Sequence, residues 1–358
     1  MSSRKKYSSA YKVVRKMFWD GKDDNNKNKQ YTLDREGIIY ALGRALKDYT
    51  SRTNEKQSGD KVASVENMIA ALTKKTRKSS FSFVDLLERY FHVKPIRSAK
   101  VFDKWHHKMC SIFCDSIKEA EIRSIVPYGK AQKIVNMTMK TIYCLEGAEA
   151  KNAMGYFTYC HMPLDSIILE WFRRYVARDW FNQTKDGRAP LQYGAESGPL
   201  PKWSNLEFKE GSLPIDFNGY KKKSNQLSSD DKYHYMLFVQ VIREYFKQPN
   251  AKNRYEGLTP LEGEFYIWQE TQLELAAEAL YSLDIGKEQA IQEAMKCWNL
   301  SWTKQEDGNI DKQFKKCTRM FKTRDLEEKV AFLQTRVVEL CRYVNFSETT
   351  SDLQEVSQ

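Results

Sequence analysis

The residues whose types and spacing could support chemistry are two lysines and an aspartate, all between positions 127 and 171. Lys133 and Lys140 are two helical turns apart, so on an α-helix they project from nearly the same face. Partial burial and a nearby second cation favour the neutral form of a lysine amine, and a neutral amine is a nucleophile. Asp165 could supply a carboxylate that stabilises positive charge developing on a substrate. The three residues therefore fit nucleophilic chemistry by an amine beside a carboxylate.

Each of these residues also has a simpler interpretation. Asp165 follows Pro163 and stands where a helix is expected to begin, so it could serve only as an N-cap. Lys133 could be an ordinary surface lysine, since most lysines are exposed. Met137 lies between the two lysines, however, and a solvated lysine stripe would not usually have a methionine in its middle. The face is therefore mixed, as the wall of a cleft would be.

Two local patterns must position these residues. Pro127 and Gly129 predict a tight hairpin directly before a helix at 130–145, and the N–H groups at such a helix start suit a phosphate oxygen. Lys133 would lie in the first turn of that helix. A second helix is expected from Asp165 to about position 180.

The hairpin, Lys133 and the segment Leu164-Asp-Ser-Ile-Ile together resemble the core of the helix-hairpin-helix DNA glycosylases. The 32 positions from Lys133 to Asp165 are similar to the spacing in the archaeal 8-oxoguanine DNA glycosylase branch. That branch also carries a second lysine two turns after the first, matched here by Lys140. The resemblance covers about 50 residues. Tyr128 stands where a second hairpin glycine is common, no histidine follows Asp165-Ser166, and the four-cysteine iron–sulfur pattern of the endonuclease III branch is absent.

The resemblance implies excision of a damaged or modified base that is flipped out of DNA, with no cofactor and no metal. Lys133 would attack the sugar to give a Schiff base, and strand cleavage by β-elimination could follow. Asp165 would stabilise the oxocarbenium-like sugar, or orient a water if Lys133 does not attack, and Lys140 would be the second cation. The expected DNA contacts are Arg123, Pro127, Tyr128, Gly129 and Lys130, extended by Lys221, Lys222 and Lys223. Phe157, Tyr159 and His161 are the aromatic candidates for the pocket that receives the base.

Helical periodicity dominates the chain and strand signals are weak, so we expect an all-α fold with the two-lobed helical core of these glycosylases. The expected organisation is a basic N-terminal segment (1–30), a core (31–283) and a helical C-terminal region (284–358). Within the core lie the hairpin and catalytic segment (125–180) and a long irregular insertion (182–231) that is rich in Gly and Pro.

Composition limits the class of protein. Lys and Arg number 58 against 47 acidic residues, a net charge of +11 that favours a polyanionic partner such as DNA but also suits a plain basic surface. No apolar run reaches the roughly 18 residues of a membrane span, and the N-terminus does not read as a secretory signal. The seven cysteines form no CxxC pair and indicate reduced thiols, so we expect a cytoplasmic protein. We also expect a monomer. Cys110 and Cys114 beside His106 and His107 look more like one helix than a metal cluster.

Several functional alternatives remain open. The enzyme could act on a bulky, hypermodified base of phage DNA, which would be a defence role rather than housekeeping repair. The chain could instead be a non-catalytic helical DNA- or RNA-binding protein that uses the hairpin only for phosphates, or a helical interaction protein. One geometric condition separates these hypotheses: for an enzyme, the Lys133 amine and the Asp165 carboxylate must face one cleft within several Å of each other.

Overall fold

The computed structural model describes residues 18, 19, 21–23, 26, 29–50, 64–177, 201–209, 233–247 and 258–281. These residues form helices joined by loops, and their only β structure is a few isolated bridges, so the all-α prediction is confirmed for the described part. The chain divides into two compact units, Met1–Tyr266 and Ile267–Gln358. Everything discussed below belongs to the first unit. The predicted C-terminal region (284–358) lies outside the described residues.

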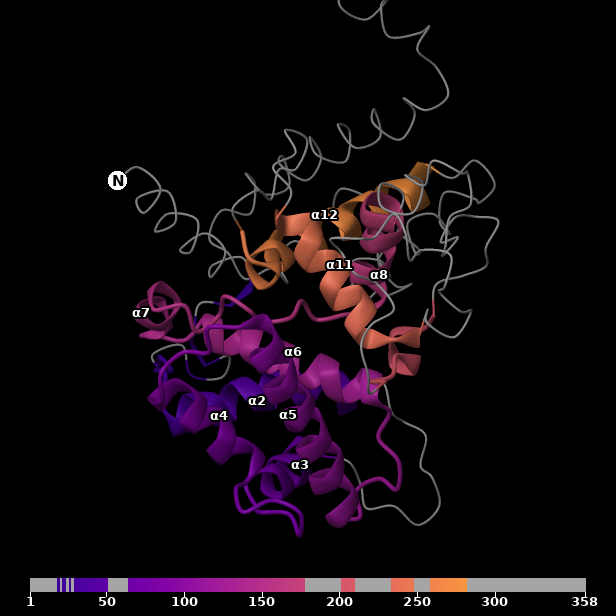
Figure 1. The fold of residues 1–358 in the computed structure, drawn as a ribbon. Helices are drawn as coiled ribbons and strands as arrows, with labels where there is room; N and C mark the ends of the chain where they lie inside the picture. The colour runs from indigo at the N-terminus through magenta and orange to yellow at the C-terminus, as the bar shows by residue number, and fades with distance from the viewer. Residues whose placement is uncertain are drawn as a thin grey trace, which may run out of the picture. The chain divides into compact units, whose positions relative to one another are not determined.

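Figure 1 shows how the helical elements of the described residues are arranged. They are α2 (Arg35–Thr50), α3 (Val65–Leu72), α4 (Phe83–His92), α5 (Ala99–Glu119), α6 (Tyr128–Tyr143), α7 (Ala148–Ala153), α8 (Ser166–Trp171), the π-helical turn η1 (Phe172–Ala177), the 3-10 turn η2 (Trp203–Asn205), α11 (Tyr235–Lys247) and α12 (Pro260–Tyr281).

Local sequence accounts for where several helices begin. Ser82 caps α4 and exchanges hydrogen bonds with Asp85 in a full capping box. Thr259 and Glu262 do the same for α12, because the Glu262 carboxylate accepts from the Thr259 backbone N–H and the Thr259 hydroxyl accepts from the Glu262 N–H. The start of α12 is therefore also set by local sequence.

Helix α6 is the central element of the described part. It packs against α2 and α5, and most of its residues are buried. In Figure 1 it lies between the group formed by α2 to α5 and helix α11. A helix buried on nearly all sides must place its polar side chains against partners, and α6 carries the two lysines singled out above.

One local prediction differs from the structure. Helix α6 begins at Tyr128 rather than at position 130, so Tyr128 and Gly129 lie in its first turn and not in the hairpin. The small-residue stretch from Gly147 to Gly155 contains the short helix α7. None of the helices in the described ranges is long and apolar enough to cross a membrane.

A buried lysine and aspartate pair

Lys133 and Asp165 meet in the structure. The Lys133 Nζ lies 3.9 Å from the Asp165 Oδ2, and the side chains are only 7% and 13% exposed. The amine comes from the second turn of α6 and the carboxylate from the start of α8. The distance meets the part of the geometric condition that concerns separation, and both groups are largely shielded from water.

Asp165 also caps helix α8. Its Oδ1 accepts hydrogen bonds of 3.0 Å from the backbone N–H groups of Ile167 and Ile168. The two carboxylate oxygens therefore have different tasks, since Oδ1 holds the helix start and Oδ2 faces Lys133. The capping interpretation and the chemical one are both compatible with this geometry, because each uses its own oxygen.

Lys140 has a close acidic partner. Its Nζ lies 2.5 Å from Oε2 of Glu264 on α12, and both side chains are buried. The rings of Phe18 and Phe265 flank the amine, with centroids at 4.2 and 4.9 Å. Glu264 therefore counters the charge of Lys140. Lys140, which was expected as the second cation near Lys133, is thus itself paired, as a buried ammonium in low dielectric needs to be.

The two pairs form one buried charge cluster, which consists of Lys133, Asp165, Lys140 and Glu264. Burial raises the pKa of the Glu264 carboxyl. Lys140 opposes this rise most strongly, Asp165 adds to it, and Lys133 also opposes it. Two amines and two carboxylates thus balance each other in this cluster, and all four side chains belong to the first unit.

Trp203 covers the amine of Lys133. The centroid of its indole ring lies 5.1 Å from the Lys133 Nζ. Helix α6 contacts the turn η2 that carries Trp203. Gly129 makes this contact possible, because a Cβ at that position would lie 2.1 Å from the Trp203 carbonyl oxygen. Gly129 is thus required for close packing between two backbones. The sequence alone had explained it by a turn before the helix.

Gln132 connects the site to the start of α6. Its side-chain amide donates to the carbonyl oxygens of Gly129 and Leu164, at 2.9 and 3.0 Å. Asn136 donates in turn to the Gln132 Oε1 and to the Tyr235 hydroxyl, both at 2.9 Å. These buried bonds hold the residue before Asp165 against the turn of α6 that carries Lys133, and so they position the pair.

A second set of buried groups surrounds His161. Its Nε2 lies 2.8 Å from Oδ1 of Asp103, and its Nδ1 lies 2.9 Å from the Tyr235 hydroxyl. Arg243 donates two hydrogen bonds to the Asp103 carboxylate and one to the Tyr159 carbonyl oxygen. These bonds join α5, α11 and the segment 159–165 that leads to Asp165, and they hold the Asp103 pKa far below its usual range despite burial.

His161 makes stability depend on pH. Burial lowers its pKa from 6.5 to about 4, and the hydrogen bond with Asp103 opposes this only in part. The unfolded chain therefore takes up a proton on this residue from pH 6.5 downward, whereas the folded protein does not until about pH 4. We expect the free energy of unfolding to fall by about 3 kcal/mol across that window from His161 alone. Buried His106, whose pKa is also lowered, adds in the same direction.

Denaturant unfolding at pH 7.5, 6.5, 5.5 and 4.5 measures this dependence. The variant His161→Gln should lose part of the slope, whereas His92→Gln, at an exposed position, should keep it. An unchanged slope in His161→Gln would contradict the assignment.

The residues expected at the base pocket have contacts that hold the fold. Phe157 is fully buried in the hydrophobic core, where it contacts Phe91 and Tyr143. The Tyr159 hydroxyl donates to the Arg97 carbonyl oxygen. His161 is enclosed in the bonds described above. Their role as a base pocket stays a prediction.

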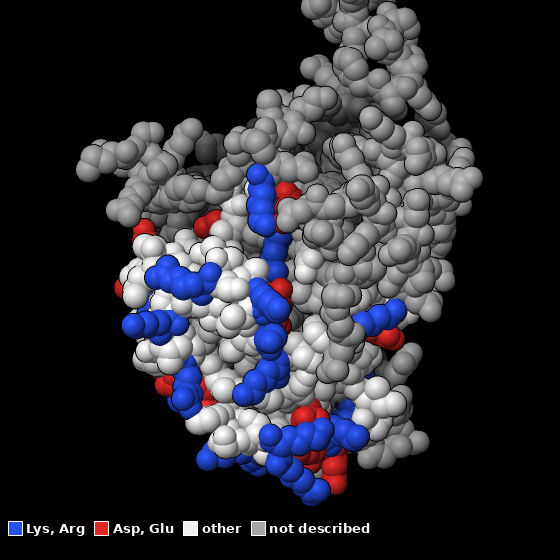
Figure 2. Space-filling view, in the orientation of Figure 1, with Lys and Arg blue, Asp and Glu red and all other residues white. Residues whose placement is uncertain are grey.

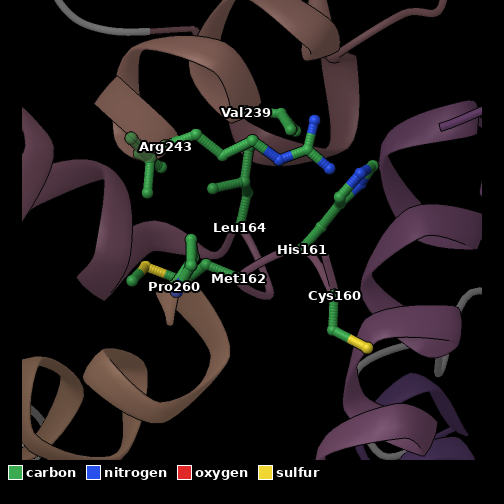
Figure 3. A pocket seen from close by; sticks show the side chains of 8 residues that line it. Cys160, His161, Met162, Leu164, Val239, Arg243 and Pro260 are labelled. Carbon is green, nitrogen blue, oxygen red and sulfur yellow. The ribbon is translucent and has the colours of Figure 1, made fainter. Parts of the chain in front are cut away.

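A narrow pocket does lie beside the segment 160–164 (Figure 3). Figure 3 shows this segment running between α11 and the start of α12, with the Arg243 guanidinium and the His161 imidazole close together. Met162, Leu164 and Val239 give the pocket an otherwise apolar lining. There is no room in it for a base, so it does not replace the expected base pocket.

The expected DNA contacts have mixed surroundings. Tyr128 packs among His107, Phe208 and Tyr235, with ring centroids at 5.6 to 5.7 Å, and its hydroxyl is buried. This placement favours a packing role for Tyr128. The Trp203 and Ser204 backbone against Gly129 favours a packing role for that residue too.

The other expected contacts lie nearer to the surface. Pro127 is exposed, and Arg123 and Lys130 are partly exposed. Lys221, Lys222 and Lys223 lie outside the described residues. Figure 2 shows a column of Lys and Arg side chains on one face, with acidic groups among them.

No protein-family model, no curated protein and no solved structure matches this chain.

Proposed function

We propose that this protein is a DNA glycosylase with lyase activity, which acts on DNA as a cytoplasmic monomer. The observation that supports this most is the Lys133 amine at 3.9 Å from the Asp165 carboxylate, in surroundings that exclude most water. An amine nucleophile and an anion for a cationic sugar are the two groups that base excision with strand cleavage requires.

The proposed reaction uses each group once. As the base leaves with the electron pair of the glycosidic bond, positive charge develops on the sugar and Asp165 opposes it. The Lys133 Nζ then bonds to C1′, the sugar ring opens, and a Schiff base results. Loss of a C2′ proton allows β-elimination of the 3′ phosphate, and water releases the amine. The same steps without attack by Lys133 would leave a monofunctional enzyme in which Asp165 orients water.

The substrate has two possible classes. One is a small oxidative lesion such as 8-oxoguanine, which the resemblance to the archaeal 8-oxoguanine DNA glycosylase branch suggests. The other is a bulky, hypermodified base of phage DNA, which would make the protein a defence enzyme. Release of such a base from phage DNA, but not of 8-oxoguanine from a synthetic duplex, would identify the second class.

Covalent trapping tests the proposal. The protein is incubated with sodium borohydride and duplexes that carry an apurinic site, 8-oxoguanine or uracil, and with phage DNA that carries hypermodified bases. Borohydride reduces the Schiff base, so a stable protein–DNA adduct is expected, with the modified peptide containing Lys133. The variant Lys133→Gln should give no adduct, whereas Lys118→Gln, at an exposed position on α5, should behave as the wild type.

Two results would overturn the proposal. One is the absence of both trapping and base release on the whole panel. The other is an adduct that persists in Lys133→Gln. Salt-sensitive binding to DNA without any product would favour the non-catalytic nucleic-acid-binding alternative, because phosphate contacts depend on ionic strength.

A further inference from the structure

Trp203 lies against the Lys133 amine, with its ring centroid 5.1 Å from the Nζ. It opens the 3-10 turn η2, within the described segment 201–209, and does not belong to an α-helix of the core. Its position is therefore a property of the 201–209 segment, which the sequence had marked only as part of an insertion.

The 201–209 segment is fixed at both ends of its described length. At its start, the Trp203 and Ser204 backbone packs on Gly129, where no side chain would fit. Near its end, Phe208 stacks on His107 of α5 with ring centroids at 3.6 Å. Glu207 exchanges two backbone hydrogen bonds of 2.8 Å with Tyr233 and Tyr235. These contacts fix the backbone that carries the indole, so the ring position does not depend on the side-chain conformation alone.

The position of the ring restricts what can approach Lys133. A reacting carbon must come to about 3 to 3.5 Å from the attacking nitrogen. Asp165 lies on one side of that nitrogen at 3.9 Å, and the indole lies over it. A nucleoside presented to the amine must therefore either contact the indole or displace it. Stacking of a base on an aromatic ring favours contact, and its loss weakens binding by roughly 5- to 150-fold.

We infer that Trp203 is a substrate-contacting residue that packs against the extruded base, so that the 201–209 segment contributes to base binding beside Lys133. The inference rests on the proposed function and deepens it. It assigns the recognition of the base to a flat aromatic face, which accepts any planar base and tolerates bulky substituents at the edge of the ring.

Comparing two substrates tests the inference, because an apurinic site has the sugar but no base. The variants are Trp203→Leu, Trp203→Phe and, as a control, Trp105→Leu on α5. The Trp105 ring contacts Tyr90 and Phe102. Each variant is first checked by thermal unfolding. Borohydride trapping on apurinic DNA then reports the amine chemistry, and excision of the best base found for the wild type reports base recognition.

We expect Trp203→Leu to lower excision by at least tenfold at subsaturating DNA while trapping on apurinic DNA stays within threefold of the wild type. Trp203→Phe should retain most of the excision, and Trp105→Leu should leave the ratio of the two activities unchanged. An equal loss of trapping and excision in Trp203→Leu would show that the indole serves only to shield Lys133, and this would overturn the inference. Failure of the wild type both to trap and to release any base would instead overturn the proposed function and this inference with it.

Discussion

Replacing Asp165 by asparagine should lower base excision by roughly 10²- to 10³-fold while leaving the fold intact. The amide oxygen of asparagine can still accept from the Ile167 and Ile168 N–H groups, and asparagine is as good an N-cap as aspartate. The atom that faces Lys133 would become an uncharged NH₂ group. The substitution therefore removes the negative charge and keeps the cap.

Asp165→Ala is the matched comparison. It removes the cap as well as the charge, so it should cost about 0.5 to 2 kcal/mol in the free energy of unfolding, which Asp165→Asn should not. If Asp165 only caps α8, activity should follow stability, and Asp165→Asn should be as active as the wild type. Initial rates of excision and denaturant midpoints, measured on all three proteins, distinguish the two outcomes.

The helices of the first unit could largely be predicted from sequence because their signals are local. The capping box of α4 needs only Ser82 and Asp85, and the start of α12 needs only Thr259 and Glu262. Asp165 belongs to the same class, since an aspartate before an apolar run is an N-cap signal whatever surrounds it. The approach of Lys133 to Asp165 was accessible only through the resemblance, because no local rule relates two separate helices.

The surroundings of the site could not be predicted, since they come from distant parts of the chain. Glu264 follows Glu262 in an apolar stretch, and an acid at such a position is a signal for a buried partner, but nothing in the sequence points to Lys140. Trp203 lies in a stretch without periodicity, so its contact with Lys133 has no sequence signature. The contacts of the base-pocket candidates could not be predicted for a related reason, because nearness in sequence to Asp165 does not determine which way Phe157 or Tyr159 points.

The largest effect on stability is expected at the buried ion pair. Lys140→Met should lower the free energy of unfolding by about 3 to 5 kcal/mol, because it leaves the Glu264 carboxylate buried without its partner. Glu264→Gln should be similarly harmful, since it removes the carboxylate that counters the buried ammonium. The double variant Lys140→Met, Glu264→Gln removes both charges and should be clearly less destabilised than the sum of the two single variants. Denaturant unfolding of the four proteins gives the coupling energy.

The effect of Lys140→Met should also depend on pH in a defined direction. Burial raises the Glu264 pKa above 4.5, and the loss of Lys140 removes the strongest opposing influence. The folded variant then holds a proton on Glu264 at pH values where the unfolded chain does not, so stability is lost as pH rises above 4.5. The difference between Lys140→Met and the wild type should therefore be small near pH 4.5 and grow toward pH 7.5. A difference that does not change with pH would mean that Glu264 leaves the interior when its partner is removed, and that the pair is held by the surrounding rings and not by its charges.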